Sequence, residues 1–248
     1  MTMKMEKVLE QFKGQTAQSP EARREQLIRN SLFSDKVMDL IGRNKEPYDT
    51  LMAYYRCAIM EVETKFNVLN EEFSIQYDRN PIESIKSRIK STDSLARKMR
   101  KNNVPLNIEA IEENISDIAG VRVVCAFTED IYMLEKCLLQ QDDIKLLTRK
   151  DYIANPKESG YRSLHLIIEV PIFLKNEKCG MKVEVQLRTI AMDCWASLEH
   201  KLKYKKELSP ELLDEVTQEL VACAEVSAEL DRRMQAVRDR IEEQNGGE

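Results

Sequence analysis

Two acidic residues lie at positions where a buried strand would normally have an apolar residue or would end. Asp117 directly precedes the β-branched run IAGVRVV, and Glu184 lies in the middle of KVEVQLR. Carboxylates at a strand mouth and on one sheet face commonly hold Mg²⁺ together with phosphate oxygens. Both residues also have an ordinary interpretation, as a helix-terminal Asp and a solvent-facing Glu. Asp117 and Glu184 are the candidate metal ligands, for Mg²⁺ or alternatively Mn²⁺.

The chain offers few other metal ligands. It has two histidines, His165 and His200, and six cysteines without a CxxC pair. This content disfavours a Cys/His zinc site, and two histidines cannot supply a phosphohydrolase centre of the His-Asp type. The apolar neighbours of the cysteines predict that most are reduced core thiols. A catalytic metal would therefore bind carboxylates.

Basic residues are concentrated in one stretch of the chain. Seven cations lie between Lys86 and Lys101, opposed there by Asp93 alone, which suits a compact polyanion such as a nucleotide triphosphate. For 97–101 a solvated helix face is the alternative. Arg88 and Lys90 share one face if SRIKS is extended. An Arg can clamp a phosphate or stack on a base, whereas a Lys acts as a point charge.

The segment KESGYRSLH, residues 157–165, supplies aromatic and imidazole groups. Tyr161 follows Gly160 at a turn, where its ring could stack on a nucleobase, and His165 lies four residues later. Neither a P-loop nor a GxGxxG motif is present. The residues alone indicate a phosphate-handling enzyme and go no further.

Composition sets the broad class. The 248 residues are 42% apolar and 33% charged, as in a helix-rich globular protein of one large or two small domains. The net charge of −5 argues against a general nucleic-acid partner. No apolar run is long enough to cross a bilayer, and the N-terminus lacks the apolar core of a secretion signal. A cytoplasmic protein without a membrane partner is expected.

Hydrophobic periodicity predicts the elements that position these residues. Residues 1–20 are expected to be loose. Helices are predicted over 19–42, 46–76, 92–102, 108–117, 128–141, 191–204 and 209–243, and strands over 85–91, 118–127, 144–153, 161–174 and 179–190. Thr92 or Asp93 is expected to cap one helix and Thr128 another. In KVEVQLR the alternation places Val183, Val185 and Leu187 on one face and Glu184 on the other. The apolar stripes of 46–77 and 209–243 exceed what one small sheet needs, which favours oligomer surfaces.

Four segments, in this order, resemble the synthetase domain of RelA/SpoT-type alarmone synthetases: NPIESIKSRIKS (80–91), DIAGVRVVCAF (117–127), DYIANPKESGYRSLH (151–165) and VEVQLRTIAMDCWASLEHKLKYK (183–205). The resemblance covers about residues 45–235 and is closest to the small members of the family. It implies an α+β fold with a mixed five-stranded, nucleotidyltransferase-like sheet flanked by helices. The expected division is an N-terminal helical extension (1–45), a synthetase domain (46–208) and a C-terminal helix and tail (209–248).

The resemblance also implies an activity. Enzymes of this family transfer the β,γ-pyrophosphate of ATP to the 3′-hydroxyl of GDP or GTP, giving (p)ppGpp. Asp117 matches the family's Mg²⁺ ligand, and Glu184 matches its essential Glu, a second metal contact and the base for the 3′-hydroxyl. Arg88 and Arg122 match residues that sandwich the adenine, and Lys90 is expected near the phosphates of ATP.

For the acceptor nucleotide, the resemblance assigns Tyr161 to the guanine base and His165 to the phosphates, with Lys157 and Gly160 in the loop before them. Asp193 either accepts hydrogen bonds from guanine or is an exposed residue at a helix start. Gln186 and Glu199 are expected to support the site indirectly.

Two alternatives stay open, and the resemblance adds one expectation about assembly. One alternative is a toxic relative that pyrophosphorylates the 3′ end of tRNA. The other is an inactive member that regulates or binds RNA. Since relatives are commonly homotetramers whose central cleft can bind alarmone, the resemblance implies a homotetramer and a possible allosteric alarmone site.

Overall fold

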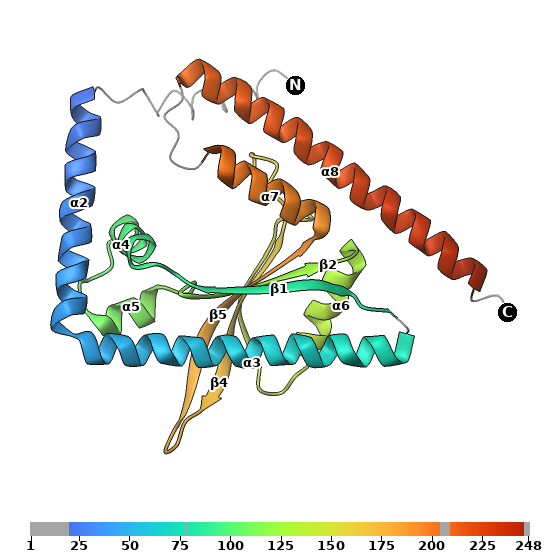
Figure 1. The fold of residues 1–248 in the computed structure, drawn as a ribbon, viewed down its shortest axis with the longest axis horizontal. Coiled ribbons are helices and arrows are strands. Elements are labelled where there is room, and N and C mark those ends of the chain that lie inside the picture. Colours follow the sequence, from blue (N-terminus) through green and yellow to red (C-terminus); the bar gives the residue numbers. More distant parts are fainter. Residues whose placement is uncertain (1–19, 78, 204–208, 246–248) are drawn as a thin grey trace.

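The computed structural model describes residues 20–77, 79–203 and 209–245, which form a mixed sheet with helices on both faces (Figure 1). The helices are α2 (Pro20–Arg43), α3 (Lys45–Tyr77), α4 (Thr92–Lys101), α5 (Ile108–Asn114), α6 (Thr128–Leu139), α7 (Ile190–Lys203) and α8 (Pro210–Asn245). The strands are β1 (Ile82–Ile89), β2 (Ala119–Cys125), β3 (Lys145–Asp151), β4 (Leu164–Phe173) and β5 (Lys178–Thr189). The predicted α+β fold with a five-stranded mixed sheet is confirmed. The predictions for residues 1–19 and for Tyr204 fall outside the described residues.

The strand order is β1-β2-β5-β4-β3, with β2 and β5 parallel and the other neighbours antiparallel. The strand predicted over 85–91 is present as β1, which begins three residues earlier than predicted and ends at Ile89. Central β2 is rich in β-branched residues, whereas β5 alternates between buried apolar residues and polar residues on the other face. No helix among the described residues is long and apolar enough to span a bilayer.

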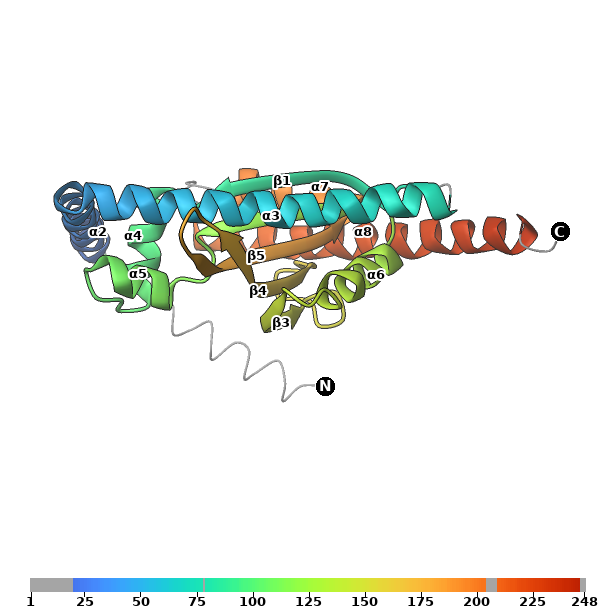
Figure 2. The same cartoon turned by 90° about the horizontal axis from the view of Figure 1, so that it is seen from below.

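Helix α3 lies across one face of the sheet and completes its core (Figure 2). Its apolar residues recur at three- and four-residue spacing, and those facing the sheet are buried: Leu51, Met52, Tyr55, Ala58, Ile59, Val62, Phe66 and Leu69. From the sheet, the predicted inner row Val183, Val185 and Leu187 is fully buried against it. Most of the α3 stripe therefore belongs to the core.

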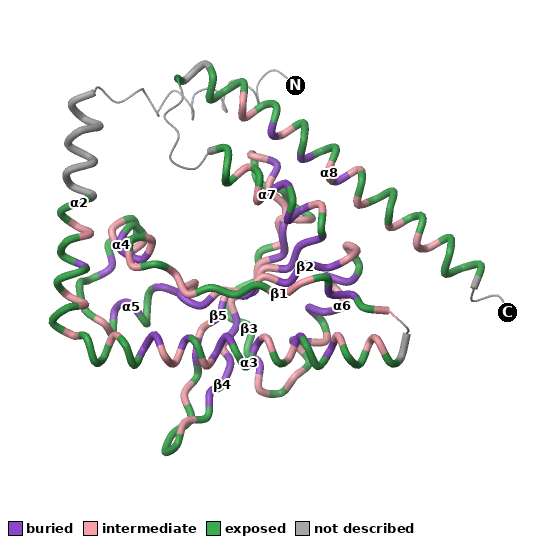
Figure 3. The backbone as a smooth tube through the Cα atoms, viewed as in Figure 1, coloured by how far each residue is buried: buried purple, intermediate pink, exposed green. Residues whose placement is uncertain are grey.

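Helix α8 lies on the opposite side of the sheet, against α7, and is mostly exposed (Figure 3). A small cluster of Trp195, Ala196, Leu220 and Ala224 joins the two helices, and the indole N–H of Trp195 donates to the Leu220 carbonyl at 2.9 Å. Further along α8 an apolar row remains in solvent: Val226, Leu230, Met234, Val237 and Ile241.

Two helix caps differ from the predictions. Ser91, not Thr92 or Asp93, caps α4, and its hydroxyl accepts from the Ser94 amide. At α6, Phe127 occupies the cap position and its amide donates to the Asp130 carboxylate at 3.0 Å, so Thr128 is the first helical residue. The predictions are off by one residue for Thr92 and Thr128 and by two for Asp93, within the usual uncertainty of helix boundaries.

The prediction for the cysteines is confirmed for four of the six. All six are free thiols; Cys125 is buried in the core, and Cys57, Cys137 and Cys179 are partly buried and pack against it. Cys194 and Cys223 are exposed on α7 and α8, since both lie on helix faces turned from the shared contact.

Candidate active site

One face of the sheet carries most of the predicted residues in two adjacent rows. Pairing aligns Lys86, Arg122, Gln186 and His165 across β1, β2, β5 and β4. The next row aligns Arg88, Gly120 and Glu184 across β1, β2 and β5. Residues paired across neighbouring strands lie on the same face, so strands far apart in sequence place their polar side chains together. Helices α4 and α7 flank this face, with α3 on the other (Figure 1).

Asp117 lies just before β2, between two lysines. Its Oδ2 accepts a hydrogen bond of 2.9 Å from Lys90 Nζ, and Lys98 Nζ lies 2.8 Å from Oδ1. Lys90 directly follows β1, and Lys98 reaches the site from α4. For Lys98 the solvated-face alternative is wrong, because its ammonium is committed to Asp117.

Glu184 lies in the middle of β5 and is largely buried. Gln186 Nε2 donates to Glu184 Oε2 at 2.8 Å, and His165 Nδ1 lies 3.4 Å from Oε1. Burial raises the pKa of the Glu184 carboxyl, but the contacts with His165 and Gln186 and the charge of Lys98 outweigh it and hold that pKa at about 2. Glu184 is therefore ionised, and Lys98 links it electrostatically to Asp117.

The two carboxylates fit a divalent metal bound jointly with substrate. Among the described residues no group of three or more His, Cys, Asp or Glu side chains is placed to hold a metal alone. Asp117 Oδ1 is buried and accepts no hydrogen bond, despite the nearby Lys98. Mg²⁺ is characteristically held by one or two carboxylates plus phosphate oxygens and water. Asp117 and Glu184 match that donor set.

Arg88 and Arg122 line a small pocket beside the carboxylates. The pocket has a volume of about 120 Å³ and lies over Gly120. A Cβ added at Gly120 would lie 3.7 Å from the Arg88 side chain, so Arg88 packs directly over this glycine. Burial lowers the pKa of the Arg122 guanidinium, and nearby Arg188 lowers it further. Two planar cations thus face one small space, a geometry suited to a flat base.

Asp193, in the first turn of α7, ties the helix to the sheet. Its Oδ1 accepts from Arg122 Nη1 at 3.2 Å and from Arg188 Nη1 at 3.1 Å, and Lys86 Nζ lies 3.9 Å from Oδ2. The side chain is buried, so the alternative of an exposed helix-start residue is wrong. Its carboxylate is ordered by the guanidinium groups of two neighbouring strands.

Arg188 connects Asp193 to the aromatic part of the site. It is 5% exposed and donates through Nη2 to Tyr161 OH at 2.6 Å and to Gln186 Oε1 at 3.0 Å. Tyr161 OH also meets His165 Nε2 at 2.8 Å. Asp193, Arg188, Tyr161, His165 and Glu184 therefore form a continuous polar chain.

Lys157 and Tyr152 complete the aromatic group. Lys157 Nζ lies 4.6 Å from the centre of the Tyr152 ring and 4.9 Å from that of Tyr161. The Tyr152 ring meets Tyr161 and His165 edge to face, at centroid distances of 6.1 and 5.3 Å. The loop thus presents one cation and two tyrosine rings beside the polar chain.

Gly160 joins this loop to α8. Its φ of +84° favours glycine, and an added Cβ would lie 2.5 Å from the Ala224 Cβ. Arg162 donates to the Ala224 carbonyl at 3.3 Å and to Glu225 Oε1 at 3.0 Å. The conformation of the loop therefore depends on contact with the C-terminal helix.

The structure brings nearly all predicted residues together. Glu199 is half-buried further along α7, and its role stays a prediction. Sequence reasoning assigned no individual role to Lys98, Tyr152 or Arg188. For Arg188 a signal existed, since alternation in KVEVQLR places it on the Glu184 face. Tyr152 falls in the predicted strand 144–153 and directly follows β3, but nothing in that pattern distinguished it from its neighbours.

Comparison with known proteins agrees with this site. A sequence family described as "Region found in RelA / SpoT proteins" matches residues 87–209. GTP pyrophosphokinase YwaC of Bacillus subtilis is 40% identical over 205 residues, which are 83% of this chain and 97% of the relative. GTP pyrophosphokinase YjbM of the same organism is 33% identical over 196 residues, 79% of this chain and 90% of the relative.

Solved structures agree as well. The small alarmone synthetase 1 of Bacillus subtilis, bound to its product pppGpp, superposes with a TM-score of 0.70 at 33% identity, covering 78% of this chain and 97% of that one. The small alarmone synthetase 2 of the same organism gives a TM-score of 0.69 at 41% identity, covering 79% and 100%. By sequence, fold and site, the chain belongs to the RelA/SpoT family.

Proposed function

We propose that this enzyme transfers the β,γ-pyrophosphate of ATP to the 3′-hydroxyl of GDP or GTP, giving (p)ppGpp. The observation that carries the proposal is the position of Glu184, which lies between two differently built groups of side chains on one sheet face. The donor half comprises Arg88, Lys90, Lys98, Asp117 and Arg122. The acceptor half comprises Lys157, Tyr161, His165, Arg188 and Asp193. Membership of the RelA/SpoT family supports the same chemistry.

The donor half suits ATP. Arg88 and Arg122 would enclose the adenine, while Lys90 and Lys98 would neutralise the triphosphate. A divalent metal held by Asp117 and Glu184 would neutralise charge on the transferred phosphates. Binding would then release the lysines from Asp117 toward the phosphate oxygens.

The acceptor half suits a guanosine nucleotide. Tyr161 offers a ring for the guanine, and Asp193 offers an ordered carboxylate oxygen to its N1–H and N2–H groups. Lys157 and His165 lie beside that ring, where acceptor phosphates would be expected. Gln186 acts indirectly, by holding Glu184 on one side and Arg188 on the other.

Glu184 would accept the proton of the 3′-hydroxyl. The 3′-oxygen attacks the β-phosphorus of ATP, the bond to the oxygen that bridges the α- and β-phosphorus breaks, and AMP leaves. Since its pKa is held at about 2, Glu184 orients the hydroxyl as an ionised acceptor rather than as a strong base. Phosphoryl-type transfer depends mainly on such positioning and charge neutralisation.

An acceptor panel tests the proposal. The protein is incubated with γ-labelled ATP and, separately, with GDP, GTP and bulk tRNA. Label in GDP or GTP is expected. Label in tRNA alone would favour the toxic tRNA-modifying relative, and no transfer to any acceptor would favour an inactive member.

The exposed row on α8 motivates a proposal about assembly. Val226, Leu230, Met234, Val237 and Ile241 recur at three- and four-residue spacing, as in a helix that packs on a partner. We propose a homo-oligomer, with a homotetramer as the expected form. The L230E/M234E variant should have a smaller particle mass than the unmodified protein when both are measured by light scattering. An unchanged mass would contradict the role of α8. An allosteric alarmone site, a cytoplasmic location and the division at residues 45 and 208 stay predictions.

A further inference from the structure

A second basic cavity lies between α2 and α4, outside the candidate active site. It has a volume of about 530 Å³ and is lined by polar residues of both helices: Ser31, Ser34, Asp93, Arg97, Arg100 and Lys101. The α2 residues that line it come earlier in the sequence than the segment 87–209 that matches the RelA/SpoT family. We propose that this cavity binds a small molecule carrying two or more phosphates.

The charge of the cavity favours an anion. Arg97, Arg100 and Lys101 share one face of α4 through i, i+3 and i+4 spacing, and Asp93 is the one acidic group among the described lining residues. Like charges this close repel one another, and neither Arg100 nor Lys101 forms an ion pair with a described side chain. A polyphosphate would relieve that repulsion.

Arg100 provides a second, independent observation. Its Nη1 is buried and has no hydrogen-bond partner among the described atoms. A buried guanidinium N–H without an acceptor is costly, and rotation of the Arg100 side chain, which lines the cavity, would bring it to phosphate oxygens that match its planar fork. The hydroxyls of Ser31 and Ser34 lie across the cavity on α2 and can donate to the same ligand.

The size of the cavity limits the ligand class. A volume near 530 Å³ exceeds what inorganic phosphate requires and falls in the range of small-molecule sites. Phe33 and Ala96 add apolar surface to the wall, which suits an organic group attached to the phosphates.

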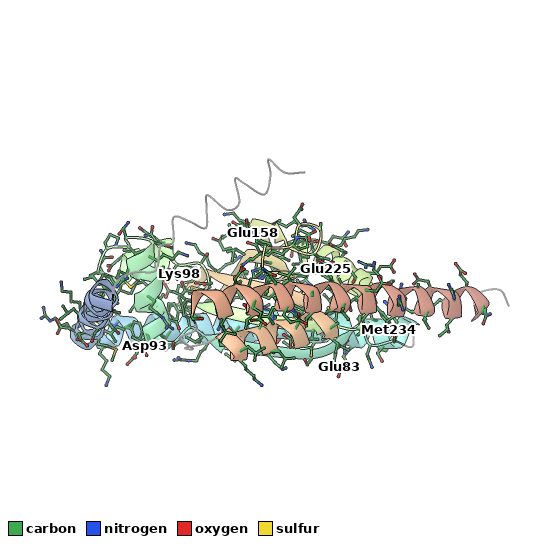
Figure 4. The ribbon with its side chains drawn as sticks, turned by 90° about the horizontal axis from the view of Figure 1, so that it is seen from above. Glu83, Asp93, Lys98, Glu158, Glu225 and Met234 are labelled. Carbon is green, nitrogen blue, oxygen red and sulfur yellow. The ribbon has the colours of Figure 1, made fainter. Side chains whose placement is uncertain are left out.

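Helix α4 connects this cavity with the active site. Figure 4 labels Asp93, which lines the cavity, and Lys98, which pairs with Asp117, on the same helix beside α2. A ligand that bridges α2 and α4 would fix the position of α4 and therefore of Lys98. Occupancy is expected to change the KM for ATP more than the KM for the acceptor.

Inorganic tripolyphosphate is the probe for the test. Calorimetric titrations use the full chain at a fixed free Mg²⁺ concentration, with the active site saturated by GDP and a non-hydrolysable ATP analogue. One tripolyphosphate per chain is expected. The R100Q/K101Q variant should bind it at least about tenfold more weakly, because charged hydrogen bonds are lost. The K136Q/K150Q variant removes the same charge from exposed positions on α6 and β3 and should bind as the unmodified protein does.

The D93N variant changes affinity in the opposite direction. It removes the acidic group described in the lining and should strengthen binding by up to about fivefold, an effect that misfolding cannot produce. Three results would overturn the proposal: no saturable binding to the unmodified protein, equal losses in R100Q/K101Q and K136Q/K150Q, or no gain in D93N.

Discussion

Ion pairs build the donor half of the site, whereas hydrogen bonds to an aromatic loop build the acceptor half. In the donor half, Lys90 and Lys98 approach Asp117 within 2.9 Å, and all three residues come from β1, α4 and the start of β2. In the acceptor half, Tyr161 OH is held at 2.6 Å by Arg188, and its loop rests on α8 through Gly160. The ion pairs around Asp117 are complete within the sheet and α4, while the acceptor loop depends on a C-terminal helix.

This difference bears on how the enzyme is organised. Ion pairs around Asp117 can exchange their partners for substrate phosphates without a change in the backbone. The acceptor loop has less freedom, because the φ of Gly160 and its contact with Ala224 determine the position of Tyr161. Figure 4 labels Glu225 and Met234 on the same helix, so a partner bound to the exposed row on α8 would act on a helix that also supports the acceptor loop.

The largest effect is expected where the halves meet. Glu184→Gln keeps the shape of the side chain but removes its charge, so transfer should fall by about 10²–10⁴-fold. Circular dichroism and the thermal midpoint should stay close to those of the unmodified protein. Glu169→Gln, on neighbouring β4 outside the site, is the matched control. Near-normal turnover of Glu184→Gln would show that the central carboxylate is misassigned.

The Gly160→Ala substitution should affect the acceptor half but not the donor half. The φ of +84° and the 2.5 Å approach to the Ala224 Cβ should displace the loop at a cost of about 1–3 kcal/mol. The acceptor KM should rise about tenfold or more, while the KM for ATP stays within about twofold. Gly42→Ala is the control, because its Cβ would meet nothing within 4 Å.

The double variant G160A/A224G shows how much of that effect comes from the helix contact. Removing the Ala224 Cβ relieves the contact but not the unfavourable φ, so recovery should be partial. Equal increases in both KM values for Gly160→Ala would mean that the halves are not built independently.

The sequence predicts some parts of the fold and of the site better than others. Alternation in KVEVQLR places Glu184 and Gln186 correctly on the polar face, because the strand period of two is unambiguous. The resemblance identified Arg122 and Gln186 individually, but strand register, which places them side by side, could not be predicted. Strand order itself could not be predicted, since pairing between distant segments leaves no local pattern.

The contacts of the terminal helices were harder to predict. Apolar stripes of 46–77 and 209–243 look alike in the sequence, yet α3 buries most of its stripe and α8 leaves Val226 71% exposed. Periodicity shows that a face needs a partner but not which partner it has. The contact of Gly160 with Ala224 joins segments 64 positions apart and had no signal in the sequence.

Tyr161→Ala tests the role of the ring within the acceptor half. Acceptor binding should weaken by about 1–3 kcal/mol, the range of base–aromatic stacking, with little change in the KM for ATP. Tyr161→Phe keeps the ring and removes only the hydroxyl bound to Arg188 and His165. It should therefore weaken acceptor binding less than Tyr161→Ala does. An unchanged acceptor KM in Tyr161→Ala would contradict the stacking role.

The smallest effect concerns the exposed part of the loop–helix contact. Glu225 is 61% exposed where it pairs with Arg162, so Glu225→Gln should cost less than about 1 kcal/mol of stability. Chemical denaturation measures the free energy of unfolding, and the acceptor KM should stay within about twofold. A loss comparable with that of Gly160→Ala would mean that charge, rather than close packing at Gly160, holds the loop on α8.

The most direct test of the proposed reaction is its stoichiometry, followed by ³¹P NMR with ATP and GDP as substrates. Transfer of the β,γ-pyrophosphate predicts one AMP for each GDP consumed, together with new diphosphate resonances from a 3′-modified guanosine nucleotide. Formation of ADP and GTP instead would identify a simple phosphotransferase and contradict the account.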